Sequence, residues 1–138
     1  MTDFVLVNAM VPAPGESPGE WWGNLGHVMP ADVLDAFFHD VPADVVAAAM
    51  EQGEPPQSGT PFEKPWPLAA WPGVPTLFLQ GRDDRFFPPE FQRRVVADRL
   101  GDVTFEEIPG GHLNALSRPV ELVDHLLGPA PTSGRTPS

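Results

Sequence analysis

The segment Thr76-Leu-Phe-Leu-Gln80, followed directly by Gly81-Arg-Asp-Asp-Arg-Phe-Phe-Pro88, decides the fold class of this 138-residue chain. The first part is an almost continuously apolar run, which predicts a β-strand covered on both faces. Glycine, two aspartates and proline in the second part predict a loop at the end of that strand. The next residues predict a helix that ends at Gly101 and carries on one face Phe91, Val95, Val96 and Leu100.

Strands and helices alternate on both sides of this unit. The apolar run at residues 4–7 predicts a second strand, and residues 103–108, where Val103 and Phe105 alternate with polar residues, predict a third. A last helix is predicted to begin at Arg118-Pro119 and bears Val120, Val123, Leu126 and Leu127. Two short helices, predicted to begin near Pro30 and Pro42, have the apolar faces Val33, Leu34, Phe37, Phe38 and Val45, Val46, Ala49, Met50. The order strand, helical insertion, strand, helix, strand, helix predicts an α/β fold with parallel strands.

Three stretches lack a helical or strand pattern. Residues 11–19 are dense in proline and glycine and predict a loop. Residues 53–75 are also rich in proline but contain Phe62, Trp66 and Trp71, which favours a packed irregular segment over a linker. Residues 128–138 consist largely of proline, serine, threonine and glycine and predict a disordered tail. We therefore expect one domain over residues 1–127, with a cap segment at about residues 20–72.

Charge and composition exclude several classes of function. The chain has 8 basic and 19 acidic residues, and the net charge of −11 argues against binding to nucleic acid or to an anionic membrane surface. The absence of cysteine excludes disulfides, thiolate metal sites and a cysteine nucleophile. No run reaches the ~18 apolar residues of a membrane span, and the N-terminus lacks the pattern of a signal peptide. We expect a cytoplasmic protein.

Two residues follow consecutive predicted strands and have the chemistry of an acid–base pair. Asp84 follows the strand at residues 76–80, and His112 follows the strand at residues 103–108, 28 residues later. Neighbouring parallel strands bring such loops to one edge of the sheet, where functional groups collect. An aspartate bonded to one imidazole nitrogen fixes the tautomer and stabilises the imidazolium. Singly, Asp84 fits a turn or cap residue and His112 a polar loop residue; together they favour catalysis.

The motifs around these residues resemble those of the α/β-hydrolase family. Gly81-Arg-Asp-Asp84-Arg-Phe-Phe-Pro88 resembles the catalytic-acid loop G-x-x-D-x-x-x-P, and Gly110-Gly-His112 resembles the catalytic-histidine loop. The stretch from Asp84 to Gln92 is similar to the branch that holds esterases and hydroxynitrile lyases. The resemblance covers about residues 4–127 and implies the C-terminal portion of the fold: the sixth strand, a small helical cap, and the seventh and eighth strands. It implies Asp84 as the acid, in preference to Asp83, and His112 as the general base.

The serine nucleophile that this family requires is not identified in the chain. The elbow motif G-x-S-x-G has one literal match, Gly15-Glu-Ser17-Pro-Gly19. An elbow follows its strand at once, whereas Pro12 and Pro14 separate Ser17 from the first strand. The residue after the nucleophile must also donate its backbone N–H to the oxyanion, and Pro18 has none. We therefore expect no nucleophile here; Ser58 lies in a loop, Ser117 fits an N-cap, and Ser133 and Ser138 lie in the tail.

The surroundings of the pair suggest a substrate pocket and no cofactor. Phe86 and Phe87, just past the acid, and Leu113, just past the base, are the candidate pocket residues. Four aromatic residues of the cap either line this pocket or pack the cap onto the sheet: Trp21, Trp22, Phe37 and Phe38. No histidine and carboxylate spacing fits a metal site, and Gly110-Gly111 is too weak for a phosphate loop. We predict no metal and no cofactor.

The resemblance implies a serine hydrolase of the carboxylesterase type, acting on a small ester. Because the nucleophile half is missing, we expect the chain alone to be inactive. Hydroxynitrile lyases of this branch carry a lysine where Leu113 stands, which favours ester hydrolysis over lyase or C–C bond hydrolase chemistry on the same pair. The alternative is a non-catalytic half-domain that pairs with a separate N-terminal half, or with a second copy, through the exposed sheet edge at residues 4–7. A truncated gene product is the third possibility.

Overall fold

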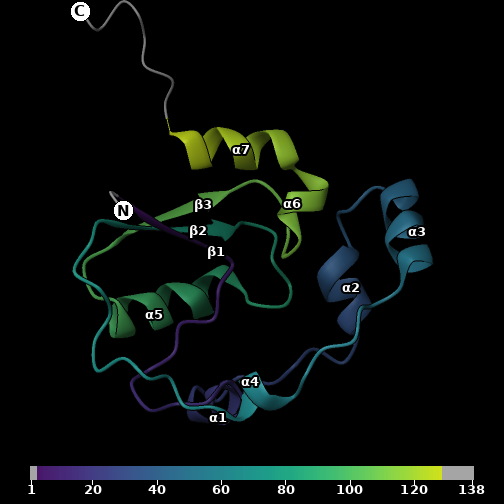
Figure 1. Cartoon of the computed structure of the whole chain (residues 1–138). Helices are drawn as coiled ribbons and strands as arrows, with labels where there is room; N and C mark the ends of the chain where they lie inside the picture. Colours follow the sequence, from purple (N-terminus) through teal and green to yellow (C-terminus); the bar gives the residue numbers. More distant parts are fainter. Residues whose placement is uncertain (1–2, 129–138) are drawn as a thin grey trace, which may run out of the picture.

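Three parallel strands form the sheet of the computed structural model, which describes residues 3–128 (Figure 1). The strands β1 (Phe4–Val7), β2 (Thr76–Gly81) and β3 (Thr104–Ile108) lie in the order β1-β2-β3. Phe4 lies opposite Thr76 in the first pair, and Leu77 lies opposite Thr104 in the second. The three predicted strands and their parallel arrangement are thus confirmed, and β2 occupies the centre.

One helix covers each face of this sheet. Figure 1 shows α5 (Pro89–Arg99) below the sheet and α7 (Pro119–Leu127) above it. Because successive side chains of a strand point to opposite faces, Phe78 packs with the α5 residues and Leu79 packs with Leu122 of α7. Phe78 and Leu79 are both fully buried. The continuous apolarity of β2 therefore reflects a strand covered on both faces, as expected.

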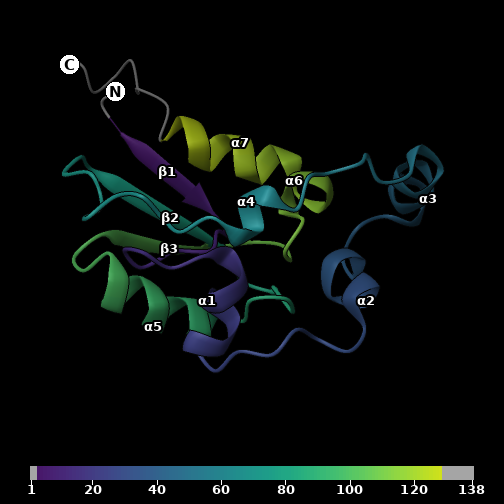
Figure 2. The same cartoon turned by 60° about the horizontal axis from the view of Figure 1, so that its bottom comes forward.

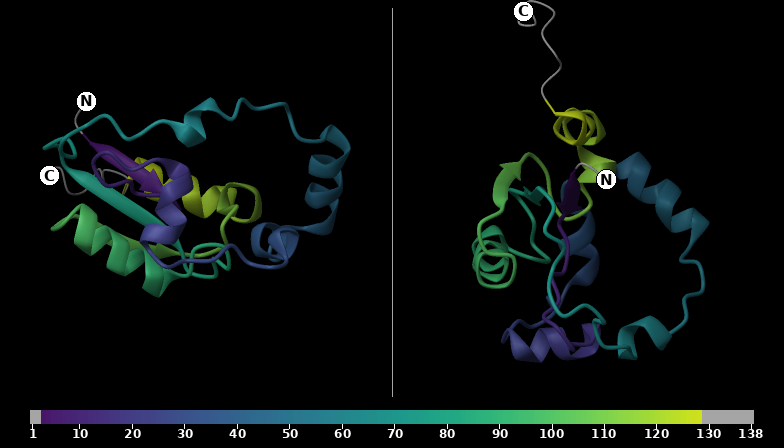
Figure 3. Two further views of the ribbon diagram at one scale, coloured as in Figure 1. Left: turned by 90° about the horizontal axis from the view of Figure 1, so that it is seen from below. Right: turned by 60° about the vertical axis from the view of Figure 1, so that its left-hand side comes forward.

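The insertion between β1 and β2 contains four helices: α1 (Pro18–Asn24), α2 (Val33–Phe38), α3 (Ala43–Gln52) and α4 (Thr60–Glu63). Figures 2 and 3 show these helices following a wide arc, in which α3 lies away from the sheet. Two backbone hydrogen bonds close the arc, Gly15 N–H to Trp66 O and Trp66 N–H to Glu16 O. Helices α2 and α3 were predicted; α1 and α4 were not.

Helix α1 corrects the prediction of a loop through residue 19. Ser17 is its N-cap, and the Ser17 hydroxyl and the Glu20 carboxylate bind each other's backbone N–H groups in a capping box. Pro18 occupies the first turn, where its missing N–H has no helical partner to lose. The helix carries Trp21 into the core, where its side chain is 1% exposed and donates to Val11 O. Residues that favour turns therefore begin a helix here.

The proline-rich segment 53–75 is packed only towards its end. Residues 53–65 are exposed, and Phe62 in α4 is 50% exposed. Trp66 and Trp71 are partly buried and stack with their ring centroids 5.0 Å apart. The expectation of a packed segment is therefore wrong for its first half and right for the two tryptophans.

The chain after β3 also differs from the prediction at two points. Ser117 ends a short helix, α6 (Asn114–Ser117), and the N-cap of α7 is Arg118 instead of Ser117. The apolar residues predicted on the last helix are exposed: Val120 by 68%, Val123 by 50%, Leu126 by 45% and Leu127 by 80%. Only Leu122 of α7 is buried. We call Val120, Val123 and Leu127, which share one side of the helix, the outer face of α7.

A buried ion pair joins the loop after β1 to the end of α5. The Arg99 guanidinium donates to both carboxylate oxygens of Glu16, at 2.6 and 2.9 Å, and to Val11 O at 2.8 Å. The two side chains are 10% and 4% exposed. Burial raises the pKa of Glu16, but hydrogen bonds from Arg99, Asn24 and the Ala13 N–H outweigh it and hold that pKa below 4.5. The pair is therefore ionised in the folded protein at neutral pH.

Two further expectations concern membranes and the tail. Between residues 3 and 128, none of the helices combines the length and the apolar character needed to cross a bilayer. The cytoplasmic location stays a prediction. The disordered tail predicted for residues 128–138 lies outside the described residues, except for Gly128, which caps α7.

Candidate active site

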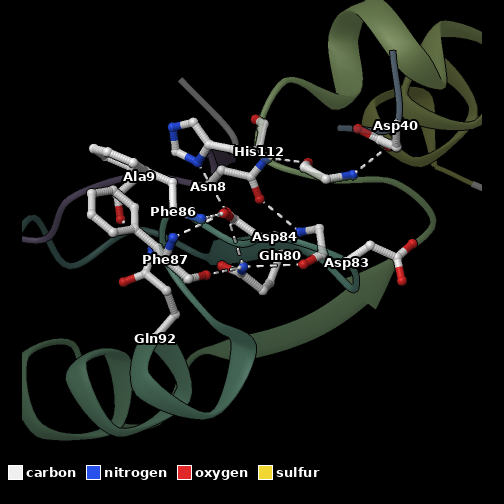
Figure 4. A network of polar contacts seen from close by, with 12 residues as sticks. Asn8, Ala9, Asp40, Gln80, Asp83, Asp84, Phe86, Phe87, Gln92 and His112 are labelled. Atoms are coloured by element: carbon white, nitrogen blue, oxygen red, sulfur yellow. Dashed lines mark hydrogen bonds and ion pairs between the residues drawn. The ribbon is translucent and has the colours of Figure 1, made fainter. Parts of the chain in front are cut away.

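Asp84 and His112 meet at the carboxyl end of the sheet. Asp84 lies three residues past the end of β2, and His112 lies four residues past the end of β3. The Nδ1 atom of His112 is 2.9 Å from Oδ2 of Asp84 (Figure 4). The Asp84 side chain is 0% exposed and the His112 side chain 15% exposed. This distance lies within the roughly 2.6–3.2 Å at which an acid and a base act as hydrogen-bonded partners.

Three further donors hold the buried carboxylate of Asp84. Oδ1 accepts from the backbone N–H groups of Phe86 and Phe87, both at 2.8 Å. Oδ2 accepts from Nε2 of Gln80 at 3.3 Å, and that amide also donates to Phe87 O at 2.9 Å. These hydrogen bonds replace the water that a carboxylate loses on burial. They also fix the direction in which Oδ2 faces His112.

Asp83, the competing acid, has a different position. Its side chain is exposed and points away from His112 in Figure 4. Its backbone N–H donates to Gly110 O at 2.9 Å, and its carbonyl accepts from Nε2 of His39 at 2.8 Å. The geometry thus places Asp84, and not Asp83, against the imidazole.

A close backbone contact brings the two loops together. Arg82 N–H donates to Ile108 O at 2.8 Å, which extends the β2–β3 pairing beyond the strand ends. A Cβ atom on Gly81 would lie 2.5 Å from Gly111 O and 2.8 Å from Gly110 O. Only glycine fits at this position, because any side chain would clash with the backbone that leads into His112.

The pair has the geometry of a general base with its orienting acid. Because a carboxylate only accepts, the contact with Asp84 places the imidazole proton on Nδ1. The other nitrogen, Nε2, makes no hydrogen bond to the part of the chain that the structure describes. It is therefore able to accept a proton, and Asp84 would stabilise the resulting imidazolium. Residues 3–128 hold no cluster of three or more metal-ligating side chains.

Helix α2 of the cap and the two residues after it contact both loops. The Phe37 ring stacks on the His112 ring, with the centroids 5.3 Å apart and the planes at 20°. Asp40 accepts from Gly111 N–H at 2.7 Å, and His39 binds the Asp83 carbonyl. Asp35 pairs with Arg85 at 2.9 Å. This region, residues 35–40, thus fixes the loops from the cap side.

The aromatic residues past the acid are buried against the histidine. Phe86 is 7% and Phe87 is 2% exposed, and their ring centroids lie 4.9 and 5.2 Å from that of His112. Leu113 is partly buried and is the N-cap of α6. A pocket formed by these three residues stays a prediction. Among the cap aromatics, Phe37 reaches the histidine, whereas Trp21 packs in the core.

Ser17 has a structural task in this fold. Its hydroxyl donates to Oε2 of Glu20 at 2.8 Å, and the residue is only 9% exposed. The capping box holds Ser17 at the start of α1, which Figure 1 places at the bottom of the molecule, away from α6. These contacts agree with the physical arguments against Ser17 as a nucleophile.

Three polar residues at the site were not predicted from the sequence. Asn8 follows β1, and its side chain binds Gly81 and His112, as Figure 4 shows. Gln80 supports Asp84 from β2, and Asp40 supports Gly111 from the cap. Asn8 directly follows a strand, as Asp84 and His112 follow theirs, so its position alone was a signal. Asp40 gave none, because it lies 71 residues from Gly111 in the chain.

Known proteins with similar sequence or structure agree with this architecture. A family model described as "Alpha/beta hydrolase family" matches residues 2–125. A pyrethroid hydrolase from Sphingobium faniae JZ-2 has a TM-score of 0.63 and 22% identity, over 91% of this chain and 59% of that one. Polyneuridine aldehyde esterase has a TM-score of 0.71 and 20% identity, over 92% and 61%. No curated protein matches the chain. The chain spans about three-fifths of these structures, which share its fold.

Proposed function

Because the chain belongs to the alpha/beta hydrolase family, we propose that it provides the acid and the general base of a serine hydrolase for small esters. The observation that carries this proposal is the 2.9 Å contact between His112 Nδ1 and the buried, fully hydrogen-bonded Asp84 carboxylate. That contact leaves Nε2 as the basic nitrogen. The proposal places a serine hydroxyl from outside this chain next to Nε2.

In each half of the proposed reaction, His112 first accepts a proton and then donates it. Nε2 removes the proton from the serine hydroxyl while the serine oxygen forms a bond to the ester carbonyl carbon. The imidazolium then gives this proton to the leaving alcohol oxygen as the C–O bond of the ester breaks. In the second half, Nε2 removes a proton from water while the water oxygen bonds to the acyl carbon. The imidazolium then gives this proton to the serine oxygen as its bond to the acyl carbon breaks, which releases the acid. Asp84 keeps the imidazole in the Nδ1–H tautomer and stabilises its charge in both halves.

Two observations favour an ester over other substrates of the same pair. Leu113 stands where hydroxynitrile lyases of the resembling branch carry a lysine. The rings of Phe37, Phe86 and Phe87 surround His112 with apolar surface, which suits an uncharged substrate better than a charged one. Lyase and C–C bond hydrolase chemistry remain the runners-up, and the acid–base pair would serve them as well.

We expect the 138-residue chain alone to hydrolyse p-nitrophenyl acetate at the background rate, because no serine among residues 3–128 hydrogen-bonds to Nε2 of His112. The measurement compares the purified chain with its His112→Ala variant by the release of p-nitrophenol. Equal rates are expected. Rapid turnover that His112→Ala abolishes would contradict the absence of a nucleophile. Reading the coding sequence upstream of Met1 tests the same point, because an in-frame G-x-S-x-G after an apolar strand would supply the serine.

Pairing with another polypeptide is a second candidate function, and the surface of the chain favours it. Among the described residues, nothing pairs with the outer edge of β1. The outer face of α7 exposes three large apolar side chains on one side of a helix. About two-fifths of each of the two solved structures quoted above lies outside the part that this chain covers. We propose that a nucleophile-bearing half adds a strand to β1 and covers the outer face of α7.

Replacing Val120 and Val123 together by serine is expected to abolish this association and to leave the fold intact. Both side chains are at least half exposed, so the free energy of unfolding should change by less than about 1 kcal/mol. Light scattering after size exclusion measures the mass, and circular dichroism measures the fold. Phe62→Ser, at a half-exposed site on α4, is the matched control. A monodisperse wild-type monomer that copurifies with no protein would contradict the pairing.

A further inference from the structure

Asn8 has an unusual backbone conformation at a position next to the catalytic loops. It is the first residue after β1, is 7% exposed and has a φ of +48°. Within the described range it is the only residue other than glycine with a positive φ. Asparagine tolerates this left-handed conformation better than most residues, but a glycine would adopt it with less strain. A glycine would relieve that strain but would lose the side-chain contacts of Asn8.

The side-chain amide of Asn8 connects the ends of all three strands. Its Oδ1 accepts from Gly81 N–H at 2.6 Å, at the end of β2. Its Nδ2 donates to the His112 carbonyl at 2.8 Å and to Gly111 O at 3.4 Å, in the loop after β3. Its own backbone N–H donates to Leu79 O, which continues the β1–β2 pairing. Figure 4 shows Asn8 between the end of the sheet and His112.

We propose that Asn8 is the positioning residue of the acid–base pair. The amide holds the backbone of His112 at a fixed distance from the end of β2, and Asp84 leaves that same strand three residues later. Fixing both backbones relative to one strand end fixes the approach of His112 Nδ1 to Asp84 Oδ2. The catalytic meaning of this role rests on the proposed function, whereas the contacts themselves do not.

The chemistry of the site explains why an amide is required. Gly81 presents a donor and His112 presents an acceptor, so the bridging side chain must accept on one atom and donate on another. Aspartate would keep the bond to Gly81 N–H, but its second oxygen would face the His112 carbonyl and repel it. Alanine and glycine would lose both bonds. Asn8→Asp therefore breaks the hydrogen bond to His112 and keeps the one to Gly81 of β2.

A buried amide with no link to the His112 loop provides the control for a purely structural role. Gln92 in α5 is 0% exposed, and its Nε2 donates to the carbonyl of Ala9, the residue next to Asn8. The Gln92→Ala substitution should weaken the packing around the end of β1 without changing the contacts of His112. Asn8→Asp and Gln92→Ala thus differ in whether they release the histidine loop.

The experiment reads the tautomer of His112 by ¹⁵N NMR in the 138-residue chain at neutral pH, where it needs no enzymatic activity. We expect the Nδ1–H form in the wild type and in Gln92→Ala. In Asn8→Asp and Asn8→Gly we expect a mixture of the Nδ1–H and Nε2–H forms, because the ring no longer faces Asp84. Asn8→Gly retains the positive φ, so it is the variant that should fold without strain.

Two results would overturn the proposal. One is a folded Asn8→Asp or Asn8→Gly that keeps the wild-type His112 tautomer. The other needs no variant: the Asn8 side-chain NH₂ of the wild type would exchange with solvent as fast as that of an exposed asparagine. Neither result depends on ester hydrolysis, so failure of the proposed function leaves the positioning role testable, and the reverse also holds.

Discussion

Replacing Asp84 with asparagine is expected to lower kcat about 10⁴-fold in any protein or complex that joins this chain to a serine nucleophile. The amide is nearly the same size, so the fold and the contact with His112 should survive. An amide NH₂ facing His112, however, favours the tautomer with the proton on Nε2, which then cannot accept a proton from the serine. The imidazolium would also lose the negative charge that stabilises it.

The measurement is the kcat of p-nitrophenyl ester hydrolysis by the joined protein. Asp83→Asn is the matched control: it removes one charge from the adjacent, exposed residue and should leave kcat unchanged. His112→Ala should cost at least as much as Asp84→Asn, and the double variant should be no slower than His112→Ala, since the two residues act as a unit. A large loss of kcat in Asp83→Asn with little loss in Asp84→Asn would show that Asp83, and not Asp84, is the acid.

Replacing Arg99 with alanine is expected to lower the free energy of unfolding by about 3–5 kcal/mol, because it leaves the Glu16 carboxylate buried without its cation. The whole stability of a domain of this size is about 5–15 kcal/mol, so the variant should be partly unfolded at moderate temperature. Urea denaturation measures the change. Arg93→Ala, which breaks an exposed ion pair with Glu107, should cost less than about 1 kcal/mol. Similar losses in the two variants would contradict the buried character of the Arg99 pair.

The same pair predicts how stability changes in acid. The folded-state pKa of Glu16 lies below its ordinary value of 4.5, so the ionised carboxylate stabilises the fold above that pH. This contribution is lost as the pH falls from 4.5 through the folded-state pKa. The difference in urea midpoint between the wild type and Arg99→Ala should therefore be full at neutral pH and shrink below pH 4.5. A constant difference across this range would argue against an ionised Glu16.

The strands and the contact between Asp84 and His112 were predictable because their signals are local. The apolar run of β2 and the motif from Gly81 to Pro88 lie together in the sequence, and they fixed both the sheet and the position of Asp84. Helix α1 was missed because proline and glycine dominate residues 11–19. The spacing Ser17-x-x-Glu20, which is that of a capping box, was present and would have indicated a helix start.

The remaining parts of the site depend on distant contacts that no local pattern encodes. Gly81 approaches Gly111 so closely that no Cβ atom fits between them, and this contact arises only when β2 and β3 pair. Asn8 lies 104 residues from its partner His112, so its role becomes visible only in the folded chain. The exposure of α7 was equally hidden, because its apolar pattern is the same whether a helix faces a core or a partner.

The cap contacts of residues 35–40 limit how a substrate gains entry to this site. Phe37 stacks on the base, Asp40 binds the backbone just before it, and His39 binds the loop of the acid. An outward movement of α2 would break these contacts and loosen the loops that carry Asp84 and His112. The proposed function therefore requires a substrate path beside α2 that leaves these contacts intact.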